Sequence, residues 1–484
     1  MMMTSRMKAT ELFINSVCLP QTLDFLHFCD IINFKSEREN HMKIQLSDHF
    51  TYSKLIRYAL PSVIMTMFIS LYGIMDGVFV SNFADKTSFA AISFILPFVF
   101  ALNAFGYMVG TGGAALIAKT LGEQQREKAN QLFSMLIIFI VIIGVVMSIA
   151  GLLTLHPVAM MMGATGDLLE KSVLYGNIMI SCQTAFMLQT AFQSLLPAAE
   201  KPTMGLVLTV TSGIVDILFN ALFIIVFRWG IVGAAVSSVI GQLIGSIVPL
   251  LYFSRNNSSL LRFVKPVFDR KALLKACSNG SSEMVTMLCS SVIGFIYNFQ
   301  LMRLEGENGI AAYGVILYVN VIFYTFFMGY STGSSPIVSY HYGSKNYTEL
   351  KNLCRKGLVI VGAGSIVLTA AAIIFAAPIS SFFVGYDADL SKMAHHAFVL
   401  YSTSFLFCGF NIWSSGFFTA LNNGFVSAAI AFGRTFLFQG LAITALPYIL
   451  GLDGVWLTML AAEAMTLVVA IFFFLRNKSQ YQYV

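Results

Sequence analysis

Long apolar runs recur along almost the whole chain. Twelve of them are long enough for a helix rising about 1.5 Å per residue to cross about 30 Å of hydrocarbon. With 11% charged residues and a mean hydropathy of +0.77, the composition excludes an ordinary soluble domain. The sequence therefore predicts an all-α polytopic membrane protein with twelve transmembrane helices. The runs cover residues 57–80, 89–116, 131–154, 172–197, 203–227, 231–253, 278–302, 310–337, 357–380, 394–419, 426–449 and 453–475.

The two halves of the chain repeat one another at an offset of 221 residues. Residues 60–125 match residues 281–346 without a gap, and Gly122 falls on Gly343. A long internal repeat in a membrane protein is typical of a transporter built from two homologous lobes. We therefore expect two parallel six-helix pseudo-repeats. The expected parts are a first lobe at 42–253, a cytoplasmic linker at 254–276, a second lobe at 277–475 and a cytoplasmic tail at 476–484.

The basic residues indicate how the chain is oriented. Alternate loops divide Lys and Arg nineteen to five between the two sides of the predicted membrane. Such a bias marks the richer side as cytoplasmic, which places both termini and the linker in the cytoplasm of a bacterium, with the spans in the inner membrane. The net charge of +6 is thus explained by topology and the lipid bilayer, and we expect no nucleic-acid partner.

Residues 1–41 differ from the rest of the chain. Their apolar stretch is interrupted by acidic residues and a proline, and no small-residue cleavage site follows it. The segment therefore predicts neither a signal peptide nor a span. We treat it as an atypical extension and hypothesise that Met42 is the true start, because the first membrane helix follows directly.

Acidic residues inside predicted spans are the first candidates for function, because burying a charge in hydrocarbon is costly. Asp216 and Asn220 are spaced i, i+4 and share one face of a helix. Asp76 and Ser238 lie at a comparable depth in neighbouring spans of the first lobe. Such an oxygen-rich group suits Na⁺, while two close carboxylates could instead hold a proton. Alternatively, Asp216 and Asn220 only bond neighbouring helices.

The second lobe is chemically different at the matching positions. Glu463 is expected near the midplane and is matched by Gln242 in the first lobe. Its carboxylate could face the cavity between the lobes, where it would bind a cationic substrate or carry a proton. It could equally pair with Arg434, which would be a structural salt bridge. The mostly neutral lining predicted for the second lobe consists of Tyr297, which matches Asp76, together with Asn298, Asn320 and Tyr324.

No cofactor chemistry is evident in the sequence. The seven cysteines show no metal-binding spacing, and a glycine-rich GTGG stretch lacks the strand and lysine of a phosphate loop. We therefore predict no enzyme activity and no cofactor other than a coupling ion, Na⁺ or H⁺.

Three segments together resemble the multidrug and toxic compound extrusion (MATE) family, and more closely its bacterial DinF/MepA-like branch. They are LPSVIMTMFISLYGIMDGVFVSNF (60–83), GTGGAALIAKTLGE (110–123) and GIVGAAVSSVIGQ (230–242). The resemblance implies a cation-coupled antiporter that exports amphipathic, often cationic, organic compounds by alternating access.

The resemblance also implies roles for particular residues. Asp76 and the fifth-helix pair would form the coupling-ion site, although this chain reads Asp216-x-x-x-Asn220 where the family commonly has Asn first. Pro61 matches the family's first-helix proline and would be a hinge that bends the helix. The simpler interpretation is that Pro61 only marks the start of that helix.

Two other functions remain alternatives. One is a flippase for lipid-linked saccharides from the same superfamily, although such proteins often have fourteen spans and cationic cavities. The other is a membrane scaffold that transports nothing, which would not need carboxylates at matched depth.

Overall fold

The computed structural model describes residues 44–83, 85–385 and 387–483, and every regular element in these ranges is a helix. This confirms the predicted all-α class. The predicted extension at 1–41 and the hypothesised start at Met42 lie outside the described residues.

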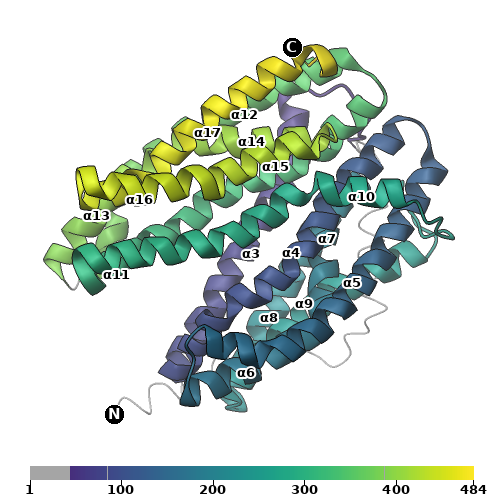
Figure 1. Ribbon diagram of the computed structural model, residues 1–484. Helices are drawn as coiled ribbons and strands as arrows, with labels where there is room; N and C mark the ends of the chain where they lie inside the picture. The colour runs from purple at the N-terminus through teal and green to yellow at the C-terminus, as the bar shows by residue number, and fades with distance from the viewer. Residues whose placement is uncertain (1–43, 84, 386, 484) are drawn as a thin grey trace. The chain divides into compact units, whose positions relative to one another are not determined.

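The helices follow the order that the apolar runs predict. Figure 1 draws the helices of the first lobe in purple to teal and those of the second lobe in green to yellow. The first lobe contains α3 (Tyr52–Phe83), α4 (Lys86–Gly122), α5 (Arg126–Met161), α6 (Gly166–Ser181), α7 (Gln183–Ala198), α8 (Pro202–Asn220), the π-helix η1 (Ala221–Val226) and α9 (Gly230–Ser254). After the short helix α10 (Arg270–Asn279), the second lobe contains α11 (Ser281–Gly343), α12 (Tyr347–Val384), α13 (Ala388–Ser402), α14 (Phe405–Ala420), α15 (Gly424–Phe432), the π-helix η2 (Gly433–Leu437), α16 (Phe438–Leu450) and α17 (Leu452–Tyr481).

The described part of the chain contains ten helices that are long and apolar enough to span a membrane. The count is eleven if the bent pair α13 and α14, which meet at 46°, forms one span. The long helix α11 supplies two of the ten, because Gly306 breaks it at a φ of 63° that favours glycine. The remaining predicted span, at 172–197, is made of α6 and α7, two helices of 16 residues that meet at Cys182.

The repeat is visible in the backbone, with one correction to its register. Gly230 and Gly451 both have positive φ at the predicted offset of 221, but α8 begins 28 residues before Gly230 and α15 only 27 before Gly451. The offset in that stretch is therefore 222. The extra residue lies in a region where η1 has six residues and η2 has five, and a π-helix is a common way to accommodate an insertion. Asp216 and Asn220 thus match Phe438 and Ala442, not Leu437 and Leu441.

Two reciprocal glycine contacts join the lobes. A Cβ on Gly122 would meet the carbonyl oxygen of Tyr340, and a Cβ on Gly343 would meet that of Lys119. These pairs are related by the 221-residue offset, so α4 and α11 cross about a pseudo-two-fold axis. Gly122 and Gly343 also end their helices, as the sequence predicts. We call this region, which carries Lys119 and Lys345, the basic end.

The second contact repeats the pattern. Gly112 lies against the backbone of Ala276 and Gly280, and its counterpart Gly333 lies against Ala59, the counterpart of Gly280. Small residues let these backbones approach closely, which packs the lobes together at the basic end.

The segment before α3 ties both lobes together at the same end. The backbone N–H of Leu46 donates to Glu200 Oε1 of the first lobe at 2.7 Å. The N–H of Phe50 donates to Glu349 Oε1 of the second lobe at 2.8 Å, and His49 Nδ1 lies 2.6 Å from the other oxygen of Glu349. Leu46 and Phe50 are fully buried. We call residues 44–50 the clasp.

The opposite end is held by an exposed polar group in the first lobe. Asp85 caps α4 by accepting from the N–H of Ser88 at 2.8 Å, and Lys171 of α6 donates to the same carboxylate at 2.8 Å. The Lys171 ammonium holds the pKa of Asp85 well below its usual range.

Candidate functional site

Asp76, Asp216 and Asn220 meet inside the first lobe. Asn220 Nδ2 donates to Asp76 Oδ1 at 2.8 Å and lies 3.3 Å from Asp216 Oδ1. Asp76 belongs to α3, whereas Asp216 and Asn220 lie one turn apart at the end of α8. One amide therefore bridges the carboxylates of two helices, and the predicted juxtaposition is present in the structure.

Two adjacent serines of α9 complete the group. Ser237 Oγ donates to Asn220 Oδ1 at 2.7 Å, and its hydroxyl also interacts with the Asp216 carboxylate. Ser238, which the sequence analysis selected, lies within hydrogen-bonding reach of Asp76. The sequence analysis missed Ser237, although its position beside Ser238 was a signal that either serine could face the acids.

Small residues bring the three helices close enough for these bonds. A Cβ on Gly241 of α9 would lie 3.1 Å from the Ser212 carbonyl oxygen and 3.4 Å from Asp216 Cβ. A Cβ on Gly213 of α8 would lie 2.7 Å from the Phe68 ring of α3. As a result Asn220 is fully buried. The π-helix η1 begins at the next residue, and such irregular turns are frequent at functional sites.

The charges of this group are not balanced by basic side chains. Asp76 and Asp216 lie within hydrogen-bonding reach of one another. In the described ranges, neither forms a salt bridge with Lys, Arg or His. Two ionised carboxylates this close repel each other in a low-dielectric interior. A proton or a small cation would offset that repulsion, and the carboxylate, amide and hydroxyl oxygens are ligands that hard cations prefer.

Glu463 occupies a different environment in the second lobe. It has no exposed surface, and Arg434 Nε donates to its Oε1 at 2.8 Å. Asn411 Nδ2 donates to its Oε2 at 2.6 Å. The guanidinium of Arg434 also lies 5.2 Å from the centre of the Tyr324 ring. Of the two alternatives for Glu463, the structure therefore has the ion pair with Arg434, and the carboxylate does not face an open cavity.

The other predicted cavity residues are not gathered in one place. Tyr297 is 1% exposed and stacks on Tyr313 with ring centres 4.9 Å apart, so it is part of the core and does not line a cavity. Asn298 is exposed, and Asn320 and Tyr324 are half-buried. Gln242 is buried inside the first lobe.

Pro61 does not mark the start of its helix. α3 begins at Tyr52, so Pro61 lies within it. A proline there removes one backbone hydrogen bond and weakens the helix locally. The interpretation of Pro61 as a helix start is therefore wrong, and its role as a hinge remains a prediction.

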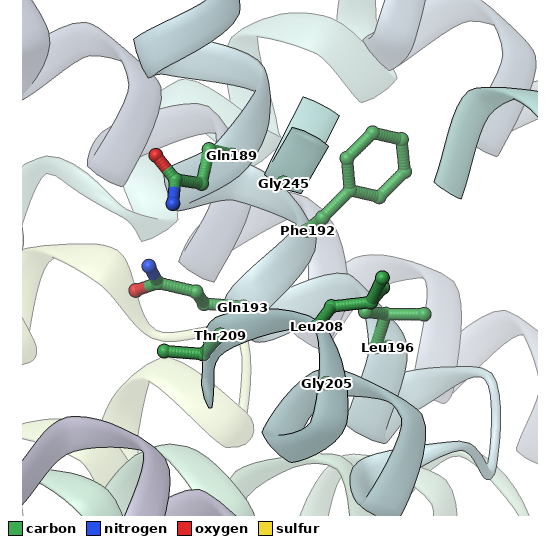
Figure 2. Close-up of a pocket in the computed structure, with 8 residues that line it drawn as sticks. All are labelled: Gln189, Phe192, Gln193, Leu196, Gly205, Leu208, Thr209 and Gly245. Atoms are coloured by element: carbon green, nitrogen blue, oxygen red, sulfur yellow. The ribbon is translucent and has the colours of Figure 1, made fainter. Parts of the chain in front are cut away.

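A small pocket lies among α7, α8 and α9 of the first lobe, with an empty volume of about 230 Å³. Figure 2 shows that the side chains of Gln189, Gln193 and Thr209 point to one side of the view, and those of Phe192, Leu196 and Leu208 to the other. Gly205 and Gly245 complete its lining.

Known proteins resemble this chain along most of its length. The MatE family model matches residues 61–222 and 284–442. The multidrug export protein MepA of Staphylococcus haemolyticus is 24% identical over 434 residues, which cover 88% of this chain and 94% of that protein. MepA of Staphylococcus aureus is 22% identical over 436 residues, with the same coverage.

Solved structures share the fold. An outward-facing multidrug resistance MATE family transporter of the MOP superfamily has a TM-score of 0.86 and 20% identity, covering 92% of this chain and 100% of that one. A MOP superfamily transporter from Pyrococcus furiosus, described as having a binding pocket of reversed polarity, has a TM-score of 0.84 and 19% identity, covering 90% and 98%. The family model matches both lobes, so the chain belongs to the MatE family of multi-pass membrane transporters.

Proposed function

We propose that this protein is a cation-coupled antiporter that exports amphipathic, often cationic, organic compounds by alternating access. The observation that carries the proposal is the pair of carboxylates, Asp76 and Asp216, bridged by Asn220. Membership of a family whose relatives include multidrug export proteins supports the substrate class.

The geometry suggests how binding would be coupled to movement. A cation held by Asp76 and Asp216 joins α3 to α8, and without it the two carboxylates repel each other. The relative energies of two arrangements of these helices therefore depend on whether the cation is bound. Such a difference in affinity is what coupling requires, since a ligand that binds both states equally shifts nothing.

The same reasoning assigns the organic substrate to the space between the lobes. Asn298, Asn320 and Tyr324 of α11 keep some exposed surface and remain candidates for contact with it. Glu463 contributes through Arg434, because its own carboxylate is already paired.

We place the basic end in the cytoplasm of a bacterial cell, with the helices in the inner membrane. The nineteen-to-five division of basic residues supports this orientation. The clasp and the glycine crossings would then close the cytoplasmic side.

The test is transport by the purified protein in liposomes, with a fluorescent organic cation as substrate and with Na⁺ and pH gradients imposed separately. We expect one of the two gradients to drive uphill substrate movement. Movement that is unaffected by both gradients would contradict the proposal.

A further inference from the structure

The places that hold the buried ion pair of the second lobe have counterparts in the first lobe. Helices α7 and α14 have the same length, as their bounds show, and α8 and α15 begin at matching turns. With the corrected register, three side chains match three others across the lobes. Asn411, Arg434 and Glu463 of the second lobe correspond to Gln189, Ser212 and Gln242 of the first.

The first-lobe residues are neutral, and two of them are incompletely bonded. Ser212 Oγ and Gln242 Oε1 are buried and have no hydrogen-bond partner within the described residues. Ser212 is 2% exposed and Gln242 is 8% exposed. A buried polar atom without a partner is costly, so each of these oxygens is available to a ligand that can donate to it or coordinate it.

These oxygens lie between the acids and the pocket of Figure 2. Ser212 is one turn from Asp216 on α8, and Thr209 of the pocket is nearly one turn further. On α9, Gln242 is three residues from Gly245, against which the Gln189 side chain packs. At about 1.5 Å per residue, Thr209 lies only about 10 Å along α8 from Asp216. The polar side chains therefore form a continuous file that runs from the acids to the pocket, in the direction of the start of α8.

The matching region of the second lobe is filled. Pocket residues Gly205 and Gly245 correspond to Ser427 and Thr466, which are larger. Ser427 Oγ is bonded to Thr419 at 2.7 Å and lies 3.0 Å from Ser415 Oγ. The guanidinium of Arg434, held by Glu463, supplies a cation built into the chain at the place of Ser212. The second lobe thus shows that this position tolerates a positive charge when oxygen ligands surround it.

We infer that the pocket lined by Gln189, Gln193 and Thr209, together with Ser212 and Gln242, is a relay site for a hydrated monovalent cation, Na⁺ or hydronium, leaving Asp216. Neutral oxygens bind such an ion weakly enough for it to move on, whereas a further carboxylate would retain it. This inference rests on the proposed function, because it gives the coupling ion a route towards the basic end.

The test uses accessibility to a small cationic thiol reagent, 2-aminoethyl methanethiosulfonate, which needs water to reach its target. The variant Thr209→Cys is made in a chain whose native cysteines are replaced, and Ala431→Cys is the matched control because Ala431 corresponds to Thr209. We expect Thr209→Cys to react at least about tenfold faster, because only the thiolate that the reagent can reach is modified. Equal rates at the two positions, or no reaction at Thr209→Cys, would overturn the inference.

The identity of the cation is tested in the same assay at constant ionic strength. Protection of Thr209→Cys by Na⁺, but not by choline, assigns the site to Na⁺; unchanged labelling in Na⁺ assigns it to hydronium.

A transport measurement separates this inference from the proposed function. We expect the double variant Thr209→Val/Gln189→Leu to slow gradient-driven transport about tenfold, while Thr209→Ser keeps the wild-type rate because it keeps the hydroxyl. An unchanged rate in the double variant would overturn the relay. Absence of gradient-driven transport in the wild type, together with labelling of Thr209→Cys, would instead contradict the proposed function and leave the hydrated site in place.

Discussion

Asp76 and Asn220 lie 144 positions apart in the chain, yet Asn220 Nδ2 donates to Asp76 Oδ1 at 2.8 Å. Because Asn220 also lies beside Asp216, this contact connects α3 to α8 at the point where the two carboxylates meet. A cation or proton that binds there acts on both helices. The predictions below concern this site, the ion pair of the second lobe and the contacts at the basic end.

The order of the acid and the amide on α8 can be exchanged. Asp216→Asn alone removes one of the two charges, and we expect it to abolish gradient-driven transport. The double variant Asp216→Asn/Asn220→Asp restores the charge one turn away, next to Asp76, and should recover part of the activity. Gradient-driven uptake in liposomes measures both variants. If the double variant is as inactive as the single one, the position of the charge on α8 matters more than its presence.

Ser237 orients the bridging amide, because its hydroxyl donates to Asn220 Oδ1 at 2.7 Å. We expect Ser237→Ala to weaken cation activation by about 1 kcal/mol, or about fivefold in the half-saturating concentration. Ser246→Ala is the control, because Ser246 bonds only to a carbonyl of its own helix. A shift of the same size in the control would show that the effect is not specific to the site.

The Arg434–Glu463 pair is expected to matter for stability. Removing one partner leaves a buried charge uncompensated, so Glu463→Gln or Arg434→Met should each lower the free energy of unfolding by about 3–5 kcal/mol. The double variant Arg434→Met/Glu463→Met should lose less than either single change. Denaturant unfolding of the detergent-purified protein measures this. Additive losses in the double variant would show that the two residues do not act as a pair.

Gly122 allows α4 and α11 to touch at the basic end. A valine there would collide with the Tyr340 carbonyl, so we expect Gly122→Val to separate the lobes at this end and to lower transport. Spin labels at positions 128 and 351, which are exposed and lie in different lobes, report the separation as a distance distribution. Gly294→Val is the control, because a Cβ at Gly294 meets nothing within 4 Å. An unchanged distribution for Gly122→Val would exclude this crossing as the contact that holds the lobes together.

The clasp should act in the same direction. Glu349 accepts from the N–H of Phe50 and contacts His49, so Glu349→Ala frees the segment from the second lobe. We expect a broader distance distribution between the same two labels. A distribution identical to that of the wild type would show that the clasp follows the lobes and does not hold them.

The sequence was sufficient to predict the helices and the main members of the site. Apolar run length predicts spans because the bilayer forces backbone polar groups into helices. The i, i+4 spacing of Asp216 and Asn220 predicts their common face, and depth along the spans brings Asp76 to the same level. These inferences depend only on helix geometry.

The remaining features depend on the rotation and register of helices, which periodicity in a uniformly apolar span does not determine. Ser237 and Ser238 differ by about 100° around α9, so the sequence alone could not show that both face the acids. The pairing of Glu463 with Arg434, and the burial of Tyr297, depend on the rotation of α17 and α11. The one-residue shift of the repeat was hidden because η1 and η2 differ in length without any change in composition.

The most direct test of the account is gradient-driven transport by Asp76→Asn beside the wild type, each in liposomes under separate Na⁺ and pH gradients. Both proteins are first shown to elute as a single species of equal thermal stability, so that a loss reflects the site and not the fold. The account predicts that Asp76→Asn loses transport under the gradient that drives the wild type, because the amide removes one of the two charges that hold the cation. Full gradient-driven transport by Asp76→Asn would contradict it.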